Sequence, residues 1–378
     1  MPISIHLIAA ARPNFMKIAP LYHALAQEDW CRPLIVHTGQ HYDANMSDAF
    51  FRDLRLPSPH FHLEVGSGTH AEQTGRVMMA YEKIAMQEKP DWVVVVGDVN
   101  STAACAMVAT KLWIPVIHLE AGLRSGDRRM PEEINRLVTD AISDVLWTPS
   151  PDADENLTRE GVPSSKIDRV GNIMIDSFEM LRKVIEDDET RTRMGLGSED
   201  YGVVTLHRPS NVDDRGNLEP LVRQLVEVSR DLRLVFAVHP RTRRKLQEFG
   251  LLALQEGPHE PRSQTLLGAQ EGRIILTDPL GYVQFMNLVC GARIAITDSG
   301  GVQEETTYLG IPCLTLRENT ERPITVTEGS NRLVTPERLH LEVRTALTNG
   351  PHPGRRPALW DGKTAGRCVA ALKRRAGA

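Results

Sequence analysis

The stretch Trp92-Val93-Val94-Val95-Val96 is continuously apolar and ends at Gly97-Asp98. A strand covered on both faces of a parallel sheet has this pattern, because neither face meets water. Short β-branched or apolar runs alternate with helix-length amphipathic segments on both sides of this stretch, almost from end to end of the chain. The alternation predicts an α/β protein built on doubly wound parallel sheets.

Periodicity locates the individual elements. In the first half we expect strands at residues 4–10, 33–37, 92–96, 116–119 and 145–148, and helices at 17–27, 43–54, 69–87, 101–112 and 132–141. The pattern restarts after Gly171-Asn172, with strands at 201–206, 233–238, 273–276, 293–297 and 312–316 and helices at 178–193, 218–231, 282–290, 301–309 and 364–375. The stretch 256–271, rich in Gly, Pro and His, is predicted to be an exposed loop.

Length and the restarted pattern together predict two domains. A chain of 378 residues corresponds to two domains at about 150 residues each. We expect a Rossmann-like domain over 1–171, a second over 172–363, and a basic C-terminal helix within 364–378 that packs back on the first domain. Two such domains face a central cleft, where folds of this class commonly bind ligands.

Composition excludes several classes of protein. Lys and Arg number 44 against 49 Asp and Glu, a net charge of -5, so the basic surplus of a nucleic-acid binder is missing. The five cysteines are scattered without a CxxC pair, which argues against a disulfide scaffold or a zinc site. No apolar run approaches the roughly 18 residues of a membrane span, and the N-terminus lacks the basic start of a secretion signal. We expect a soluble cytoplasmic protein that binds neither nucleic acid nor a membrane.

Unusual polar residues follow the strands of the first half, at the edge where open parallel sheets bind ligands. Arg12 and Lys17 follow the first strand, Asp98 the valine run and Glu120 the next strand, while Glu132 opens a helix. Singly, each has an ordinary explanation as a solvated cation, a helix cap or a complement to a helix dipole. Three carboxylates from adjacent strand ends are harder to explain as caps alone.

The second half repeats this arrangement. His207 follows its first strand, and Ser299-Gly300-Gly301 joins a later strand to a helix, the geometry that cradles phosphate on backbone N–H groups. Glu305 lies one helical turn later, within reach of a ribose diol, and Arg322 suits a diphosphate. The alternatives are a structural histidine, a tight turn with exposed glutamates and a charged loop. The sequence contains no P-loop pattern, no full GxGxxG and no convincing metal-ligand spacing. These residues therefore indicate a phosphorylated or nucleotide-linked substrate and leave the reaction open.

Read in order, these motifs carry a resemblance to a known family. The segments are Arg12 to Lys17 (Arg-Pro-x-x-x-Lys), Gly97-Asp98, His118-Leu119-Glu120-Ala121-Gly122-Leu123-Arg124-Ser125-Gly126-Asp127, Pro131-Glu132-Glu133, His207-Arg208, Asp298-Ser299-Gly300-Gly301-Val302-Gln303-Glu304-Glu305 and Thr320-Glu321-Arg322-Pro323. Together they resemble the non-hydrolysing UDP-N-acetylglucosamine 2-epimerases, bacterial isomerases with a GT-B fold. The segments extend over nearly the whole chain in the expected order.

The resemblance implies a reaction. UDP-N-acetylglucosamine (UDP-GlcNAc) and UDP-N-acetylmannosamine (UDP-ManNAc) interconvert, in the service of cell-surface polysaccharide biosynthesis, without NAD or a metal. UDP leaves by anti elimination to give enzyme-bound 2-acetamidoglucal, and returns after C2 has been reprotonated on the other face. The resemblance also implies UDP binding in the domain over 172–363 and a homodimer.

The resemblance also assigns roles residue by residue. The acid–base carboxylates are Asp98, Glu120 and Glu132, and His207 is the remaining catalytic candidate, near the diphosphate. Phosphate or sugar is held by Arg12, Lys17, Ser299, Gly300, Gly301 and Arg322, the ribose by Glu305, and the uracil pocket is lined by Phe285.

Three segments depart from the family pattern. The family's Gly-Thr-Arg-Pro-Glu is Ala10-Ala11-Arg12-Pro13-Asn14 here, its His-Arg-Arg-Glu is His207-Arg208-Pro209-Ser210, and its Gln-His-Arg-Gln is Gln40-His41-Tyr42-Asp43. In well-known members the last two segments help to form an allosteric UDP-GlcNAc site. A lost Arg and a gained Asp would weaken diphosphate binding there, so we expect altered or absent activation by substrate.

Other interpretations remain open. The first is a 2-epimerase of another UDP-N-acetyl sugar, of the 6-deoxy or diacetamido-uronic acid type. A GT-B glycosyltransferase would share the nucleotide-binding half, but it has no use for three carboxylates around C2. A nucleotide-sugar-binding regulator without turnover, and a hydrolysing relative that releases free N-acetylmannosamine, are the remaining alternatives.

Overall fold

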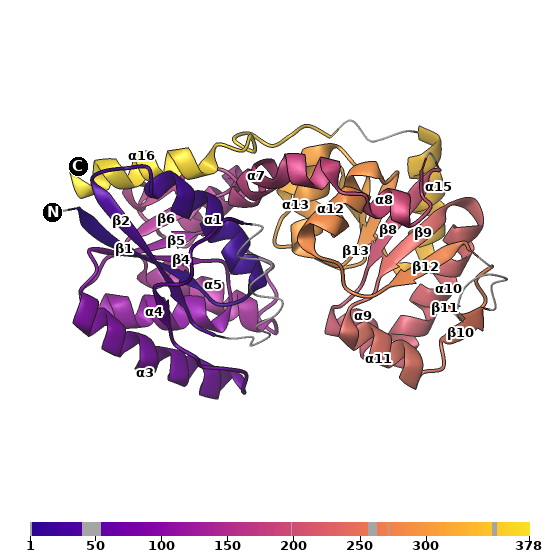
Figure 1. Cartoon of the computed structure of the whole chain (residues 1–378), viewed down its shortest axis with the longest axis horizontal. Coiled ribbons are helices and arrows are strands. Elements are labelled where there is room, and N and C mark those ends of the chain that lie inside the picture. The colour runs from indigo at the N-terminus through magenta and orange to yellow at the C-terminus, as the bar shows by residue number, and fades with distance from the viewer. Residues whose placement is uncertain (1, 40–53, 198, 256–262, 271, 350–353) are drawn as a thin grey trace. The chain divides into compact units, whose positions relative to one another are not determined.

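The computed structural model describes residues 2–39, 54–197, 199–255, 263–270, 272–349 and 354–378. The chain forms two compact units, Met1–Leu181 with Ala358–Ala378 and Arg182–Pro357, which we call the first and the second unit (Figure 1). It passes from the first to the second within helix α7 (Ile173–Asp187), which begins just after the domain boundary expected at 171. Both units are α/β, so the fold class predicted from the alternation is confirmed.

The first unit is built on a seven-stranded parallel sheet ordered β3-β2-β1-β4-β5-β6-β7. The strands are β1 (Ile3–Ala9), β2 (Cys31–His37), β3 (Phe61–His62), β4 (Trp92–Val96), β5 (Val116–Leu119), β6 (Val145–Thr148) and β7 (Ile167–Arg169). Val93, Val94 and Val95 are completely buried, because β4 lies at the centre of the sheet. The five predicted strands are confirmed, and β3 and β7 are short edge strands that periodicity missed.

Helices lie on both faces of this sheet. They are α1 (Arg12–Leu25), α3 (His70–Glu88), α4 (Asn100–Lys111), α5 (Pro131–Ile142), α6 (Pro151–Arg159), the short 3₁₀ helix η1 (Ser164–Lys166), the start of α7, and α16 (Thr364–Ala376). On one face α3 packs on α4 and α4 on α5, while α1 and α16 pack together on the other (Figure 1). The start predicted for the first helix, Lys17, is wrong: α1 begins at Arg12, because Pro13 supplies a helical φ and the Asn14 side chain closes the first turn. The helix expected at 43–54 falls outside the described residues apart from Leu54.

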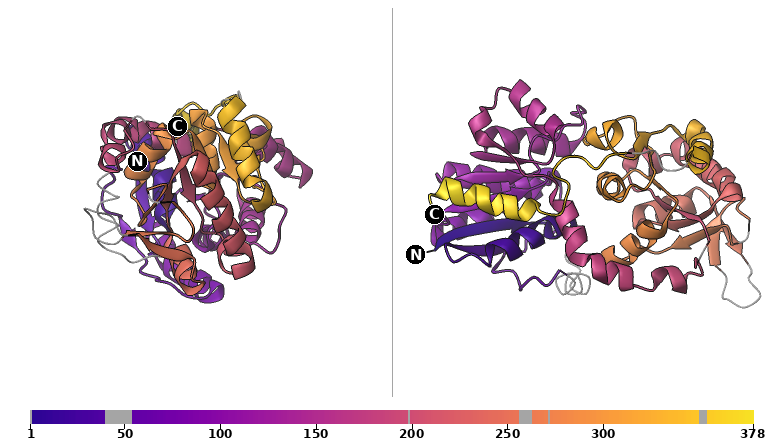
Figure 2. Two further views of the ribbon diagram at one scale, coloured as in Figure 1. Left: turned by 90° about the vertical axis from the view of Figure 1, so that its right-hand side faces the viewer. Right: turned by 90° about the horizontal axis from the view of Figure 1, so that it is seen from above.

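The C-terminal helix α16 belongs to the first unit although the second unit precedes it in sequence (Figure 2). Asp176 of α7 accepts hydrogen bonds from the backbone N–H groups of Thr364 at 3.1 Å and Ala365 at 2.8 Å. The indole of Trp360 donates to the carbonyl of Pro149 at 3.0 Å. Because Asp176 accepts the first two N–H groups of α16, the helix is anchored at its start.

The second unit repeats the architecture around a six-stranded parallel sheet ordered β12-β9-β8-β13-β14-β15. The strands are β8 (Tyr201–Thr205), β9 (Arg233–Ala237), β12 (Ile274–Thr277), β13 (Ile294–Thr297), β14 (Cys313–Thr315) and β15 (Asn331–Leu333). The five strands predicted in this half are confirmed. The loop predicted over 256–271 is wrong at β11 (Ser263–Leu266), which pairs antiparallel with β10 (Leu252–Gln255). Leu266 is completely buried, a core contact that the polar composition of the segment concealed.

The helices of the second unit connect its strands on both faces. They are α8 (Thr190–Arg193), α9 (Pro209–Val212), α10 (Arg215–Asp231), α11 (Pro240–Glu248), α12 (Tyr282–Gly291), α13 (Gly300–Leu309), α14 (Ile324–Thr327), η2 (Pro336–Arg338) and α15 (Leu339–Asn349). The single helix predicted at 178–193 is wrong, because α7 ends at Asp187 and α8 starts separately at Thr190. The Asp188 side chain accepts the N–H of Thr190 at 2.8 Å and closes the break.

The strand order of each sheet reverses at one point, and this decides where the predicted site residues lie. The reversal falls between β1 and β4 in the first unit and between β8 and β13 in the second. Beyond the carboxyl ends of such neighbours an open sheet leaves a crevice, because the connecting helices go to opposite faces. Asp98 follows β4 and His207 follows β8, so both lie at these reversal points.

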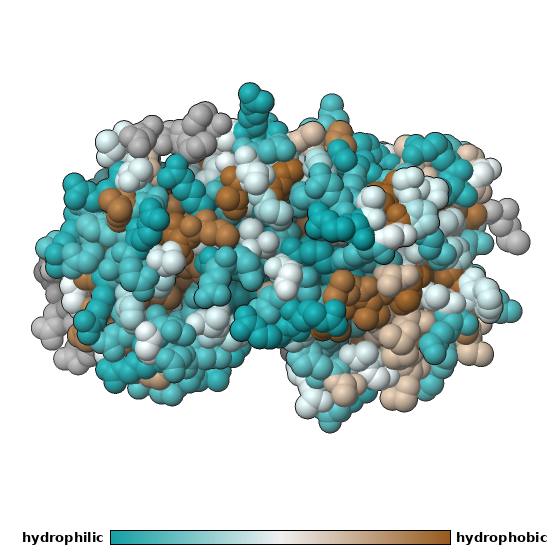
Figure 3. All heavy atoms as spheres, turned by 180° about the vertical axis from the view of Figure 1, so that it is seen from behind, coloured by the Kyte–Doolittle hydropathy of each residue, from teal (hydrophilic) through white to brown (hydrophobic). Residues whose placement is uncertain are grey.

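On the face drawn in Figure 3, hydrophilic residues predominate and hydrophobic residues form separate patches. The most exposed large apolar side chains include Trp113, Met79, Met86 and Leu341. None of the helices in the described ranges is long and apolar enough to cross a membrane.

Two buried histidines make the stability of the first unit sensitive to acid. Burial lowers the pKa of His6 in β1 and that of His37 in β2 to about 4 each, whereas an unfolded histidine titrates near 6.5. Below pH 6.5 the unfolded chain binds protons that the folded unit does not. We therefore expect the free energy of unfolding to have its full value above pH 6.5. Below that pH it should fall by up to about 1.4 kcal/mol per pH unit for each histidine, down to pH 4.

Urea titrations at about pH 7 and pH 5, followed by tryptophan fluorescence, measure this effect, because all five tryptophans lie in the first unit. His6→Gln and His37→Gln should each flatten the pH dependence, and a glutamine at the exposed His70 serves as the control. An unfolding free energy that is equal at the two pH values would contradict the prediction.

Candidate functional site

The first-unit part of the candidate site lies at the carboxyl ends of β1, β4 and β5. Lys17, in the second turn of α1, forms an ion pair with Glu120, which directly follows β5. Their side chains are 10% and 4% exposed. A Cβ at Gly97 would lie 3.0 Å from Lys17 Nζ, so glycine leaves room for the ammonium group. The structure thus brings together two of the predicted residues that are far apart in sequence.

Glu120 is held in an energetically costly conformation. Its φ is +70°, in the left-handed region, which costs about 1–2 kcal/mol for a residue with a side chain. Its N–H donates to the carbonyl of Trp147 at 3.1 Å. Its Oε1 is buried and has no hydrogen-bond partner among the described residues. A carboxylate beside an ammonium group with one unused oxygen is suited to accept a proton.

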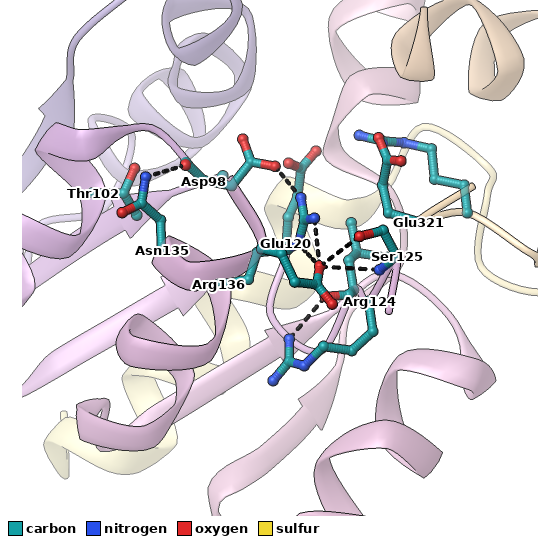
Figure 4. Close-up of polar contacts among 12 residues, drawn as sticks. Asp98, Thr102, Glu120, Arg124, Ser125, Asn135, Arg136 and Glu321 are labelled. Atoms are coloured by element: carbon teal, nitrogen blue, oxygen red, sulfur yellow. Dashed lines mark hydrogen bonds and ion pairs between the residues drawn. The ribbon is translucent and has the colours of Figure 1, made fainter. Parts of the chain in front are cut away.

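Asp98 follows β4 and is held by a buried arginine (Figure 4). Arg136 of α5 donates from Nη1 to Asp98 Oδ2, and from Nη2 to Glu133 Oε2 at 2.6 Å. The Asn135 amide donates to the main-chain carbonyl of Asp98 at 2.9 Å. The Arg136 side chain is 2% exposed and that of Asp98 31% exposed, so the carboxylate meets solvent from a rigid support.

The two neighbouring glutamates of α5 have different environments. Glu133 is buried and accepts the N–H groups of Ser125 at 3.0 Å and Gly126 at 2.9 Å. Burial would raise the pKa of the Glu133 carboxyl, but these hydrogen bonds and Arg136 outweigh burial and lower it. Glu132 is half-buried, and no side chain of the described ranges hydrogen-bonds to its carboxylate. Glu133 therefore supports the loop before α5, whereas Glu132 remains available for chemistry.

In the second unit, a buried carboxylate orients His207. His207 Nδ1 lies 2.9 Å from Asp298 Oδ1, and the backbone N–H groups of His207 and Arg208 donate to Asp298 Oδ2 at 3.0 and 2.9 Å. Burial would raise the pKa of Asp298, but the hydrogen bond and charge of His207 outweigh it and lower that pKa. The His207 side chain is 38% exposed, so Asp298 orients the ring while the ring remains accessible to solvent.

Helix α13 starts at the Ser299-Gly300-Gly301 segment directly after β13. The Ser299 N–H donates to Thr297 Oγ1 at 2.9 Å, and no side chain of the described chain caps the helix. Its first N–H groups are therefore available to an anion. A Cβ at Gly300 would lie 2.5 Å from Arg322 Nη1, so only glycine lets this guanidinium approach the helix start.

Arg322 belongs to a buried cluster of charges. Its Nε lies 2.8 Å from Glu304 Oε1 and its Nη1 2.6 Å from Glu321 Oε1. Arg317 and Arg208 also contact Glu321, at 2.8 and 3.6 Å. Burial would raise the pKa of Glu321, but Arg322, Arg317 and Arg208 hold it well below its usual value. These three arginines outnumber the two carboxylates, so the cluster favours an anion.

Glu305 and Phe285 lie on the facing helices α13 and α12. Burial, opposed by a hydrogen bond from Tyr282 and reinforced by Glu304, raises the pKa of Glu305 to about 8. At neutral pH the carboxyl is therefore mostly protonated and can both donate and accept a hydrogen bond. Phe285 packs against the buried cluster formed by Ala295, Val302 and Cys313.

The predicted residues thus form two groups, one in each unit. In the first unit Lys17, Asp98 and Glu120 lie at the carboxyl ends of β1, β4 and β5, and Glu132 lies in the first turn of α5. In the second unit the predicted residues follow β8, β13 and β14, with Phe285 on α12: His207, Ser299, Gly300, Gly301, Glu305 and Arg322. The side chain of Arg12 lies outside the described part of the structure. Sequence reasoning missed the supporting residues Arg136, Glu133 and Asp298. The spacing of Glu133 and Arg136, three residues apart on a helix, and the position of Asp298 directly after β13 were the available signals.

Similarity to known proteins extends over both units. The family model described as UDP-N-acetylglucosamine 2-epimerase matches residues 23–373. The chain is 43% identical over 340 residues to the UDP-N-acetylglucosamine 2-epimerase of Methanocaldococcus jannaschii, covering 88% of each chain. It is 40% identical over 331 residues to the UDP-2,3-diacetamido-2,3-dideoxy-D-glucuronate 2-epimerase of Pseudomonas aeruginosa, covering 86% of this chain and 87% of that one.

A solved structure shows the same similarity in three dimensions. The Methanocaldococcus jannaschii UDP-GlcNAc 2-epimerase in complex with UDP-GlcNAc and UDP has a TM-score of 0.86 and 40% sequence identity, and the match covers 98% of this chain and 100% of that chain. The structural neighbours have the GT-B fold, so the predicted fold type is confirmed.

Proposed function

Because the chain belongs to the UDP-N-acetylglucosamine 2-epimerase family, we propose that it interconverts UDP-GlcNAc and UDP-ManNAc. A base removes the C2 proton, the bond between C1 and the diphosphate oxygen breaks, and 2-acetamidoglucal forms. Return of a proton to the opposite face of C2 and re-addition of UDP complete the inversion. No step of this elimination and re-addition transfers a hydride, so the proposed reaction requires no NAD, and we propose that it uses no metal.

The observation that carries this proposal is the set of acid–base groups around β4 and β5. Elimination and reprotonation on opposite faces of C2 need two proton-transfer groups. We assign these roles to carboxylates among Asp98, Glu120 and Glu132. Lys17 pairs with Glu120 and Arg136 pairs with Asp98, so a fixed cation stands beside each of these two carboxylates.

We assign the second unit to UDP. The uncapped start of α13 and Arg322 offer donors and positive charge to the diphosphate, whose negative charge grows as it leaves. His207, oriented by Asp298, acts beside the diphosphate. We propose that Ser299, Gly300, Gly301, Lys17 and Arg12 also contact phosphate or sugar, that Glu305 binds the ribose, and that Phe285 lines the uracil pocket.

Proton NMR of the purified protein with UDP-GlcNAc in D2O, without added NAD or metal, tests the proposed function. Loss of the C2 proton signal together with growth of UDP-ManNAc is expected, because solvent deuterium replaces the abstracted proton. A spectrum in which both the C2 proton and UDP-GlcNAc persist would refute this substrate assignment.

A second candidate substrate is UDP-2,3-diacetamido-2,3-dideoxy-D-glucuronate, because a relative named for that activity is 40% identical over most of the chain. The same D2O experiment, run with each nucleotide sugar in parallel, separates the two candidates. If only the uronate exchanges its C2 proton, the uronate and not UDP-GlcNAc is the substrate. The proposed elimination route would still hold.

We also propose that substrate activation is altered or absent. Gln40 to Asp43 lie outside the described residues, and the second departing segment contains Pro209, the first residue of α9. Initial rates of the reverse reaction from UDP-ManNAc should show no lag, because the loss of an Arg and the gain of an Asp weaken diphosphate binding at a second site. A strong lag that traces of UDP-GlcNAc abolish would contradict this expectation.

From the family resemblance we also propose that the protein is a cytoplasmic homodimer. We propose that it acts in cell-surface polysaccharide biosynthesis. The exposed Trp113, Met79 and Met86 of the first unit are consistent with an apolar contact between copies. Light scattering of the purified protein gives the molar mass, and a value of one chain at micromolar concentration would exclude the dimer.

A further inference from the structure

A completely buried histidine lies beneath the turns that carry Asp98 and Glu120. His118 of β5 is 0% exposed. Its Nδ1 lies 2.5 Å from Asp140 Oδ1, and its Nε2 lies 2.8 Å from the carbonyl oxygen of Gly97. Gly97 directly precedes Asp98, so one ring nitrogen contacts the main chain of the turn after β4.

Asp140 of α5 connects the same histidine to the turn after β5. Its Oδ2 accepts the backbone N–H of Gly122 at 3.0 Å and lies 2.7 Å from Arg124 Nη1. Burial would raise the pKa of Asp140, but His118 and Arg124 outweigh burial and lower it. Arg124 is itself fixed by Glu160, to which its Nε and Nη2 donate at 2.8 and 2.7 Å.

The contacts of His118 and Asp140 link the two turns. His118 Nε2 contacts the Gly97 carbonyl, and Asp140 Oδ2 accepts the Gly122 N–H and contacts Arg124. The two side chains therefore form a buried pair that reaches one main-chain group in each turn.

The turn after β5 needs such an anchor, because Glu120 is a left-handed residue with a side chain. Gly97, Glu120 and Gly122 have φ values of +66°, +70° and +81°. A left-handed residue with a side chain persists only where its surroundings enforce that conformation. The Gly97 carbonyl held by His118 and the Gly122 N–H held by Asp140 flank Asp98 and Glu120 in sequence, so the pair enforces both turns together.

We propose that His118 and Asp140 are positioning residues that fix Asp98 and Glu120 relative to each other for proton transfer at C2. The inference rests on the proposed function, since it assigns the pair to the same reaction. Neither residue acts on the substrate. Their loss displaces two carboxylates whose effectiveness depends on alignment, and a displacement of about 1 Å can lower a rate by about 10²-fold.

Asp140→Asn tests the proposal, because it keeps the size of the side chain and removes the charge that holds His118 and Gly122. We expect kcat for UDP-GlcNAc to fall by about 10–100-fold, while KM and the Kd for UDP stay within about twofold. Asp176→Asn is the matched control, since Asp176 is a buried carboxylate of the same unit that accepts two backbone N–H groups in α16. Its kcat should remain within about twofold of the wild type even where its melting temperature falls equally.

Hydrogen exchange measured by mass spectrometry supplies a second readout that needs no substrate. Peptides that contain residues 97–102 and 120–126 should exchange faster in Asp140→Asn and at the native rate in Asp176→Asn. If the wild-type protein fails to exchange the C2 proton, the proposed function fails, and hydrogen exchange still decides whether the pair fixes the turns.

Three results would overturn the positioning role: a native kcat in Asp140→Asn, an equal loss of kcat in Asp176→Asn, or unchanged hydrogen exchange in both turns. If Asp140→Asn does not fold, Arg124→Met, which removes one donor to Asp140, is measured by the same criteria.

Discussion

Asp98→Asn is expected to lower the turnover of UDP-GlcNAc by about 10²–10⁴-fold, the usual scale for losing an acid–base group. The amide cannot take up the C2 proton, but its oxygen still accepts a hydrogen bond from Arg136, so the turn after β4 should persist. The Kd for UDP should stay within about twofold of the native value, because Asp98 is assigned to proton transfer and not to UDP. Steady-state rates and calorimetric titration with UDP measure the two quantities.

Asp168→Asn is a suitable control for this variant. Asp168 is a carboxylate of the same unit that pairs with Arg375 at 2.9 Å, away from the predicted site. Its loss should leave both turnover and UDP binding unchanged. If Asp98→Asn turned over as fast as this control, Asp98 would have no part in the mechanism.

The fold could be predicted from sequence wherever apolar residues recur with the period of a buried strand or helix. The valine run of β4 is buried on both faces, so its position was unambiguous. The strands β3, β7, β10, β11 and β15 were not predicted, because each has only two to four residues and all but β10 are at least half polar. The break between α7 and α8 is held by side-chain hydrogen bonds of Asp188 and Asn287, which no periodic pattern records.

Some residues of the candidate site could likewise be predicted from the sequence, and others could not. Asp98, Glu120 and His207 stand within two residues of the end of a strand, so topology alone brought them to the carboxyl ends of the two sheets, with Asp98 and His207 at the reversal points. Their partners lie far away in sequence: Lys17 is 103 residues from Glu120, and Asp298 is 91 residues from His207. Such pairs exist only in the folded chain. The environments that distinguish Glu132 from Glu133 likewise depend on which face of α5 is buried, a tertiary property.

Ion pairs between residues far apart in sequence change the expected effect of a mutation in the second unit. Arg322→Ala should raise the Kd for UDP by about 10–100-fold, the value of a hydrogen bond between charged groups. It should also destabilise the second unit by about 3–5 kcal/mol, because Glu304 and Glu321 remain buried while one cation is lost. Calorimetric titration with UDP and differential scanning calorimetry measure the two effects.

The double variant Arg322→Ala with Glu304→Gln separates binding from stability. Removing the buried charge of Glu304, which lies 2.8 Å from Arg322 Nε, should restore part of the melting temperature, whereas UDP binding should remain weak because the guanidinium is still missing. Arg332→Ala is the control, since that arginine makes an exposed ion pair with Glu342, worth at most about 1 kcal/mol. Native UDP affinity in Arg322→Ala would remove Arg322 from the UDP site. A UDP affinity that recovered together with stability in the double variant would show that Arg322 acts only through the fold of the second unit.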